Sequence, residues 1–210
     1  MYQVPPSYAS APLNPWISMW TRPRATIRQI VMIDSERHVH LLAIISGVGQ
    51  ALSNAEQRNL GRQMDLPAVL VFCLIFGAIG GLIGLYLAGA LLRWTGSWLG
   101  GQATSQQVRT AYAWSSVPAI WLLPIWLPKI LILGRRVFMD VGFASQTQRL
   151  AFLLFALIEL VVGIWGVVVF LKSLGEVHGF SAWKALGAAI LASLVVIVPV
   201  VLLLALLSGM

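Results

Sequence analysis

Glu159 is the residue of this sequence whose chemistry differs most from its surroundings. It lies about nine residues into the apolar run 150–171, where an ionised carboxylate would be costly inside a bilayer. Helical spacing puts Ala156, Gly163 and Gly166 on its face, and small residues let a second helix approach closely. We therefore expect Glu159 to face other helices. It is either a proton, cation or polar-substrate site, or a structural acid hydrogen-bonded across the bundle.

The charge state of Glu159 depends on whether a cation lies near it. No Lys or Arg stands within one helical turn, and burial in a low dielectric disfavours the charged form of a carboxyl group. Lys129 lies near the end of the preceding apolar run, so we expect it at the membrane interface. The sequence therefore predicts a Glu159 that is protonated at neutral pH.

The apolar run 111–133 contains Pro118, Pro124 and Pro128. Each proline removes a backbone donor, so this helix should kink or break. Broken helices form substrate sites in many transporters, although proline kinks also occur in membrane helices that transport nothing. The candidate intramembrane polar site consists of these three prolines with Lys129 and Glu159.

A stripe of small residues follows one face of the run 66–92. The stripe comprises Gly77, Gly81, Gly84 and Ala88, and its spacing indicates a close helix–helix contact, within the chain or with another copy. With Gly163 and Gly166 these are the predicted helix-packing residues.

The histidines do not predict a metal site. His38 and His40 are two residues apart, so on a helix they point to nearly opposite sides, and the zinc-protease pattern is missing. The sequence also lacks a Walker loop, a Rossmann fingerprint and a nucleophile elbow. We expect no metal, no cofactor and no enzymatic activity.

Composition defines the class of protein. Of the 210 residues, 59% are hydrophobic and 10% are charged, and the mean hydropathy is +0.85. Soluble domains are roughly a quarter charged, so this chain is an integral membrane protein. Its net charge of +7 is dispersed between apolar runs, which indicates contact with anionic lipid and no nucleic-acid partner. Cys73 is the single cysteine, so no disulfide forms within the chain.

The predicted fold is all-α, a bundle of five transmembrane helices. The spans are expected at 39–55, 66–92, 111–133, 150–171 and 185–207, within a domain covering 38–210. The first is the weakest because it contains Gln50. Thr104 with Gln107, and Ser145 with Gln148, fit the helix capping box, which favours helices over barrel strands.

The N-terminal region divides into two parts. Residues 1–13, rich in Pro, Ser and Ala, are expected to be a disordered tail. Residues 14–37 place Ile27, Ile30 and Val31 on one helical face, which predicts an amphipathic interfacial helix. A short soluble helix packed on loops is the alternative. The expected lipid-headgroup contacts are Trp16, Trp20, Arg22, Arg24 and Arg28.

Basic residues set the expected orientation. Five spans with a cytoplasmic N-terminus put eight Lys and Arg on the cytoplasmic side: Arg22, Arg24, Arg28, Arg37, Arg93, Arg109, Lys172 and Lys184. The opposite side receives five, or six with Lys129: Arg58, Arg62, Arg135, Arg136 and Arg149. This bias predicts a cytoplasmic N-terminus and a C-terminus on the opposite side.

Three stretches resemble bacterial members of the Yip domain family, the Ypt-interacting-protein-like membrane proteins. They are NPWISMWTRPRATIRQIV at 14–31, AWSSVPAIW at 113–121 and LGEVHGFS at 174–181, and the likeness extends over about 14–207. It implies five spans, a cytoplasmic N-terminus and residence in the inner (cytoplasmic) membrane.

Eukaryotic members of that family bind prenylated small GTPases in vesicle traffic. The Asp-Leu-Tyr-Gly-Pro motif of those relatives is missing here, which makes GTPase binding doubtful. We expect a non-enzymatic protein that organises the membrane or binds other proteins. Its partners would be the lipid bilayer and either a second copy or other membrane proteins. The alternative is a small transporter or channel that uses Glu159 and the proline-broken third span.

Overall fold

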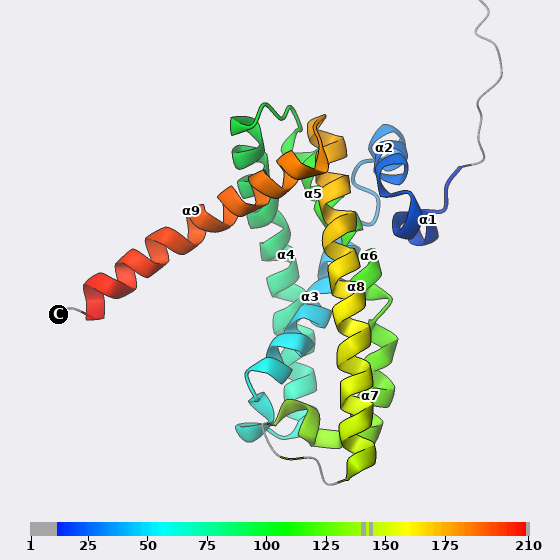
Figure 1. The fold of residues 1–210 in the computed structure, drawn as a ribbon, viewed down its shortest axis with the longest axis vertical. Coiled ribbons are helices and arrows are strands. Elements are labelled where there is room, and N and C mark those ends of the chain that lie inside the picture. The colour runs from blue at the N-terminus through cyan, green and yellow to red at the C-terminus, as the bar shows by residue number, and fades with distance from the viewer. Residues whose placement is uncertain (1–11, 140–141, 143–144, 209–210) are drawn as a thin grey trace, which may run out of the picture.

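The computed structural model describes residues 12–139, 142 and 145–208, and these form helices with no strand between them (Figure 1). The expected tail, 1–13, lies almost wholly outside the described residues. The longer helices are α2 (Pro23–Ile33), α3 (Val39–Gln57), α4 (Leu66–Trp98), α5 (Ser105–Ser115), α8 (Gln146–His178) and α9 (Ala182–Ser208). The shorter ones are α1 (Pro15–Thr21), η1 (Leu60–Arg62), α6 (Val117–Ile120), η2 (Leu123–Ile125), α7 (Trp126–Leu133) and η3 (Gly134–Phe138).

Helices α3 and α4 form the most extensive helix pair. They run antiparallel, because the earlier residue Ala43 of α3 lies against Gly81 of α4 and the later residue Ala51 lies against Gly77. Glycines allow the close approach: a Cβ on Gly77 would lie 2.7 Å from Val48 Cα, and one on Gly81 would overlap the carbonyl oxygen of Ala43. The predicted small-residue contact is therefore present at these two positions, within one chain.

The third apolar run is broken, as its prolines predict. It is divided into α5, α6, η2 and α7. Pro118 is in the first turn of α6 and Pro124 is in the first turn of η2, where a missing backbone donor removes no helical hydrogen bond. Lys129 lies in α7, the segment that follows these breaks.

Helix caps agree with the sequence where they were predicted. Thr104 and Gln107 form a reciprocal capping box at the start of α5. Ser145 caps α8 by accepting from the Gln148 amide, whereas the Gln148 side chain donates to the carbonyl of Ile132.

Among the described residues, four stretches of helix are long and apolar enough to cross a membrane: 66–98, 105–138, 146–178 and 182–208. Helix α3 is not among them. Helix α9 packs through Ala185, Ala188 and Ala192 and then leaves the bundle, so its second half is exposed (Figure 1). The structure therefore gives an all-helical protein with four candidate spans.

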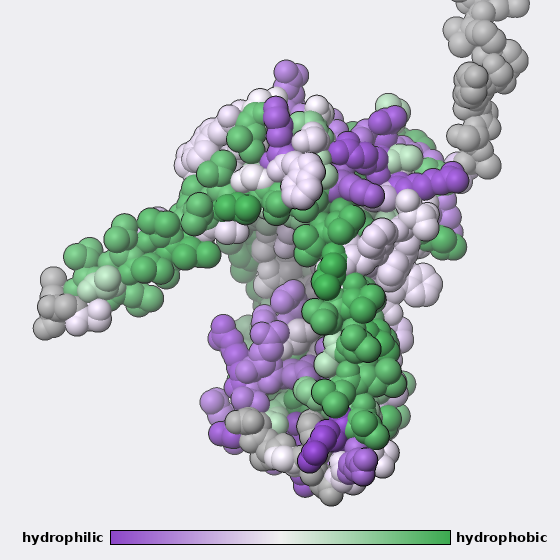
Figure 2. Space-filling view, viewed as in Figure 1, coloured by the Kyte–Doolittle hydropathy of each residue, from purple (hydrophilic) through white to green (hydrophobic). Residues whose placement is uncertain are grey.

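The N-terminal segment packs on one end of the bundle. Met19 and Ile27 are fully buried and join a core with Trp114, Val117 and Val169. Figure 2 shows polar side chains at both ends of the molecule and an apolar band along α8 and α9. The segment thus lies at one polar end, held by apolar contacts to α5, α6 and α8.

Candidate functional site

Lys129 is the centre of a charged cluster inside the bundle. It comes from α7, its side chain is 1% exposed, and its Nζ donates to Glu56 Oε2 at 2.7 Å and to Glu159 Oε1 at 2.8 Å. The ammonium also lies 4.6 Å from the centre of the Trp126 ring, a favourable cation–π distance. Helices α3, α7 and α8 each supply one member, so the cluster joins three elements that are distant in sequence.

This arrangement corrects one expectation from the sequence. Lys129 was placed at the membrane interface, away from Glu159, but the two are hydrogen-bonded. Lys129 lies in α7, where its side chain is buried and reaches Glu56 of α3 and Glu159 of α8. The prediction of a neutral Glu159 depended on there being no cation beside it, and that premise is wrong. Glu56, at the polar end of α3, was not identified as a site residue.

A cavity of about 730 Å³ lies beside the cluster. Glu159 lines it, and its side chain is 31% exposed. Four elements contribute polar or small groups: Ser46, Gln50, Ser53 and Asn54 from α3; Gly77, Gly80, Gly81 and Gly84 from α4; Ser115 and Ser116 at the end of α5; and Gly163 and Gly166 from α8. The candidate polar site is therefore an open space with one carboxylate on its wall.

The predicted packing residues divide into two groups. Gly77 and Gly81 contact α3, and Ala88 packs on the cluster shared by α4, α5 and α9. Gly84, Gly163 and Gly166 have no described atom within 4 Å of an added Cβ, and they line the cavity. The small face of α8 therefore borders a space where a helix contact was expected.

The three prolines of the third run differ in burial, and none of them is among the described residues that line the cavity. Pro118 is buried, while Pro124 and Pro128 are exposed. The described lining of the cavity includes Ser116 and Trp126, which stand on either side of the breaks, and none of the three prolines. The breaks thus determine which side chains face the cavity.

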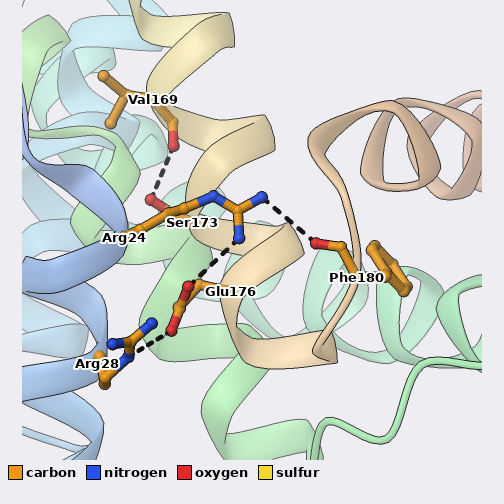
Figure 3. A network of polar contacts seen from close by, with 6 residues as sticks. All are labelled: Arg24, Arg28, Val169, Ser173, Glu176 and Phe180. Atoms are coloured by element: carbon orange, nitrogen blue, oxygen red, sulfur yellow. Dashed lines mark hydrogen bonds and ion pairs between the residues drawn. The ribbon is translucent and has the colours of Figure 1, made fainter.

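A second charged cluster fastens the N-terminal segment to the bundle (Figure 3). The Glu176 carboxylate of α8 accepts from Arg24 Nη1 at 3.3 Å and from Arg28 Nε at 2.7 Å. Arg24 also donates to the carbonyl of Phe180 at 3.3 Å, which ties α2 to the turn between α8 and α9. The hydrogen bond and the charge of Glu176 raise the pKa of the Arg28 guanidinium above its usual value. We call Arg24, Arg28 and Glu176 the arginine clamp.

The five expected headgroup contacts are thus in different surroundings. Arg24 and Arg28 pair within the chain, and Arg22 is exposed. Trp16 packs edge-on against Trp114, with ring centres 5.8 Å apart, and the Trp20 carbonyl accepts from the indole of Trp165 at 3.1 Å. Sequence reasoning missed the clamp because Glu176 is about 150 residues away along the chain, and helical periodicity does not reach that far.

The histidines do not gather around a common point. His40 bonds the Tyr86 hydroxyl at 2.9 Å, and His178 is buried and stacked on Phe180 with ring centres 5.0 Å apart. Across the described residues no three His, Cys, Asp or Glu side chains are grouped so that they could hold a metal ion.

A family comparison covers both clusters and the cavity. The family model of the Yip1 domain matches residues 17–205, nearly the whole chain. The chain belongs to the Yip1 family. Yip1 domain proteins are membrane proteins without a known enzymatic role. The match includes the arginine clamp, Lys129 and both of its carboxylate partners. No curated protein and no solved structure matches the chain.

Proposed function

We propose that this Yip1 domain protein is a non-enzymatic membrane-organising protein that holds an amphipathic segment in one leaflet of the bilayer. The arginine clamp is the observation that carries the proposal. It fixes α2 to α8, so the segment cannot move independently of the membrane-spanning helices. An anchored segment adds volume to one leaflet only, which favours curvature or lateral organisation.

The outer side of the N-terminal segment fits a headgroup region. Ile27 and Ile30 face the bundle core, whereas Ile17, Met32 and Ile33 are more than 60% exposed. Arg22, at the start of α2, is exposed as well. Apolar side chains next to a basic residue are typical of helices that lie in the membrane interface and contact anionic lipid.

We also propose that α3 makes a fifth crossing. Its 19 residues are about 28 Å long, close to the thickness of the hydrocarbon core. Near its start His40 bonds Tyr86 in the C-terminal half of α4, and at its end Ala55 packs with Val69 near the start of α4. Five crossings would place the termini on opposite sides. The basic residues support a cytoplasmic N-terminus, and the inner membrane is the proposed location.

Reconstitution tests the proposal. Vesicles of anionic lipid with the full chain should become smaller or tubular, as measured by electron microscopy and light scattering. Replacing Met32 and Ile33 by Ser should abolish the change, because the apolar groups that enter the leaflet are removed. Ala25→Ser, at an exposed position of the same helix, is the matched control. Equal remodelling by the Met32/Ile33 variant would contradict the proposal.

The cavity favours a second candidate function, a small transporter. A polar space within a bundle, with a carboxylate on its wall and a broken helix beside it, is a feature of many transport sites. Its test is solute flux into liposomes that contain the purified chain. Flux that Glu159→Gln abolishes would place transport ahead of membrane organisation.

A further inference from the structure

We propose that the cavity beside Lys129 binds a monovalent, lipophilic organic cation. The cationic centre would lie against Glu159, and the apolar body would lie against the glycine faces of α4 and α8. The proposal requires binding alone and depends on neither membrane remodelling nor transport.

The size and shape of the cavity suit a small molecule. Its volume of about 730 Å³ falls within the usual range for ligand sites, roughly 300–1,000 Å³. Gly80 and Gly84 from α4, and Gly163 and Gly166 from α8, have no described atom within 4 Å of an added Cβ. Small-residue faces in membrane bundles ordinarily pack against another helix, whereas these line the cavity. Their shared surface is smooth and open enough for a bulky apolar group.

The net charge of the Lys129 cluster favours a cationic ligand. Two carboxylates share a single ammonium, so the cluster carries a formal charge of −1 when all three groups are ionised. Glu159 lines the cavity, whereas Lys129 is fully buried, and the described lining contains no Lys or Arg. The excess negative charge is therefore on the cavity side of the cluster. A cation bound beside Glu159 would neutralise this excess charge.

The depth of the cavity excludes an ordinary lipid-facing groove. Helix α3 contacts α4 at Gly77, in the middle part of that span, through Val48 and Ala51, so Gln50 lies at a similar depth. Gln50 is exposed, and Figure 2 shows the polar area over the C-terminal half of α3 beside the apolar face of α8. Uncovered polar groups at this depth are tolerated where they line a wet or occupied cavity. An acyl chain would leave them without partners.

Aromatic rings on the wall add to cation binding. Phe76, Tyr112 and Phe170 line the same cavity from α4, α5 and α8. Aromatic faces attract desolvated cations, and the attraction does not require a hydrogen-bond donor on the ligand. The site is thus suited to a cation whose charge is spread over an apolar body.

Two ions of matched shape and opposite charge test the proposal. The full chain, purified in detergent, is titrated with tetraphenylphosphonium or with tetraphenylborate, and empty micelles serve as the blank. We expect saturable binding of the phosphonium only. Glu159→Gln should weaken that binding on the order of tenfold or more. Glu36→Gln removes a carboxylate at an exposed position outside the cavity lining and should leave the affinity unchanged.

A steric variant keeps the test decisive if Glu159→Gln does not fold. Gly163→Leu fills the cavity without changing any charge and should also abolish binding, whereas Val161→Leu, at an exposed position of the same helix, should not. The proposal is overturned by no saturable binding to the native chain, by equal binding of the two ions, or by full affinity in the folded Glu159 or Gly163 variant.

Discussion

At the scale of single residues, Lys129 has the largest structural effect. One ammonium, 1% exposed, forms ion pairs with carboxylates from two other helices. The sequence identified Glu159 and Lys129 separately as unusual polar residues in apolar runs. Their pairing could not be predicted, because it depends on how α7 packs against α8. That packing is a tertiary property with no periodic signature.

Lys129→Met should destabilise the chain strongly. It leaves Glu56 and Glu159 close together with no cation, and breaking a buried ion pair from one side costs about 3–5 kcal/mol. Thermal unfolding in detergent, followed by circular dichroism, measures the loss. Adding Glu56→Gln and Glu159→Gln in the same chain should restore much of the stability, because no unpaired charge remains. An unchanged melting temperature in the single variant would show that the ion pairs contribute nothing.

Glu176→Gln should loosen α2 without unfolding the bundle. The change removes the charge that both arginines share, while the buried contacts of Ile27 and Met19 remain. Amides of α2 should therefore exchange hydrogen faster, and amides of α4 should not. Because the pKa of Arg28 is raised, its contribution is complete at neutral pH and is lost only at strongly alkaline pH. Exchange in α2 that is unaltered by the variant would show that apolar contacts alone hold it.

At the scale of elements, the contact of α3 with α4 depends on glycine. Gly81→Ala puts a methyl group into the carbonyl oxygen of Ala43, and overpacking of this kind costs typically 1–3 kcal/mol. Gly80→Ala, one residue away and facing open space, should be neutral or slightly stabilising, since alanine favours helix. Melting temperatures of the two variants in one detergent provide the comparison. Equal melting temperatures would contradict a close α3–α4 contact.

Local chemistry made some elements predictable, and its absence made others unpredictable. The capping box at Thr104 and the breaks at Pro118 and Pro124 depend on neighbouring residues, and both were predicted. Helix α9 was predicted as a span of the bundle, yet only its first half packs there. The residues from 194 to 207 are apolar on every side, so no face of this stretch specifies a neighbour. Uniform hydropathy predicts that a segment lies in the membrane, but it does not predict which helix the segment packs against.

At the scale of the whole molecule, the two charged clusters connect different parts of the chain. The arginine clamp joins the N-terminal segment to the last turn of α8, and the Lys129 cluster joins the end of α3 to α7 and the middle of α8. Helix α8 is the common partner of both. The chain thus has one long helix against which its N-terminal segment, α3 and α7 are positioned, with the cavity between the two clusters.

The last prediction is the number of crossings, which single cysteines can determine. Cys73 is buried and is the one native cysteine, so replacing it by Ala gives a background for labelling. Glu36→Cys and Gln63→Cys flank α3, and Ser208→Cys ends α9. With five crossings, a membrane-impermeant maleimide added to intact cells should label Gln63→Cys and Ser208→Cys. Glu36→Cys should react only after the membrane is opened, as should Ser97→Cys, which marks the same end of the bundle. Labelling of Glu36→Cys and Gln63→Cys from one side would mean that α3 does not cross, and that four spans carry the fold.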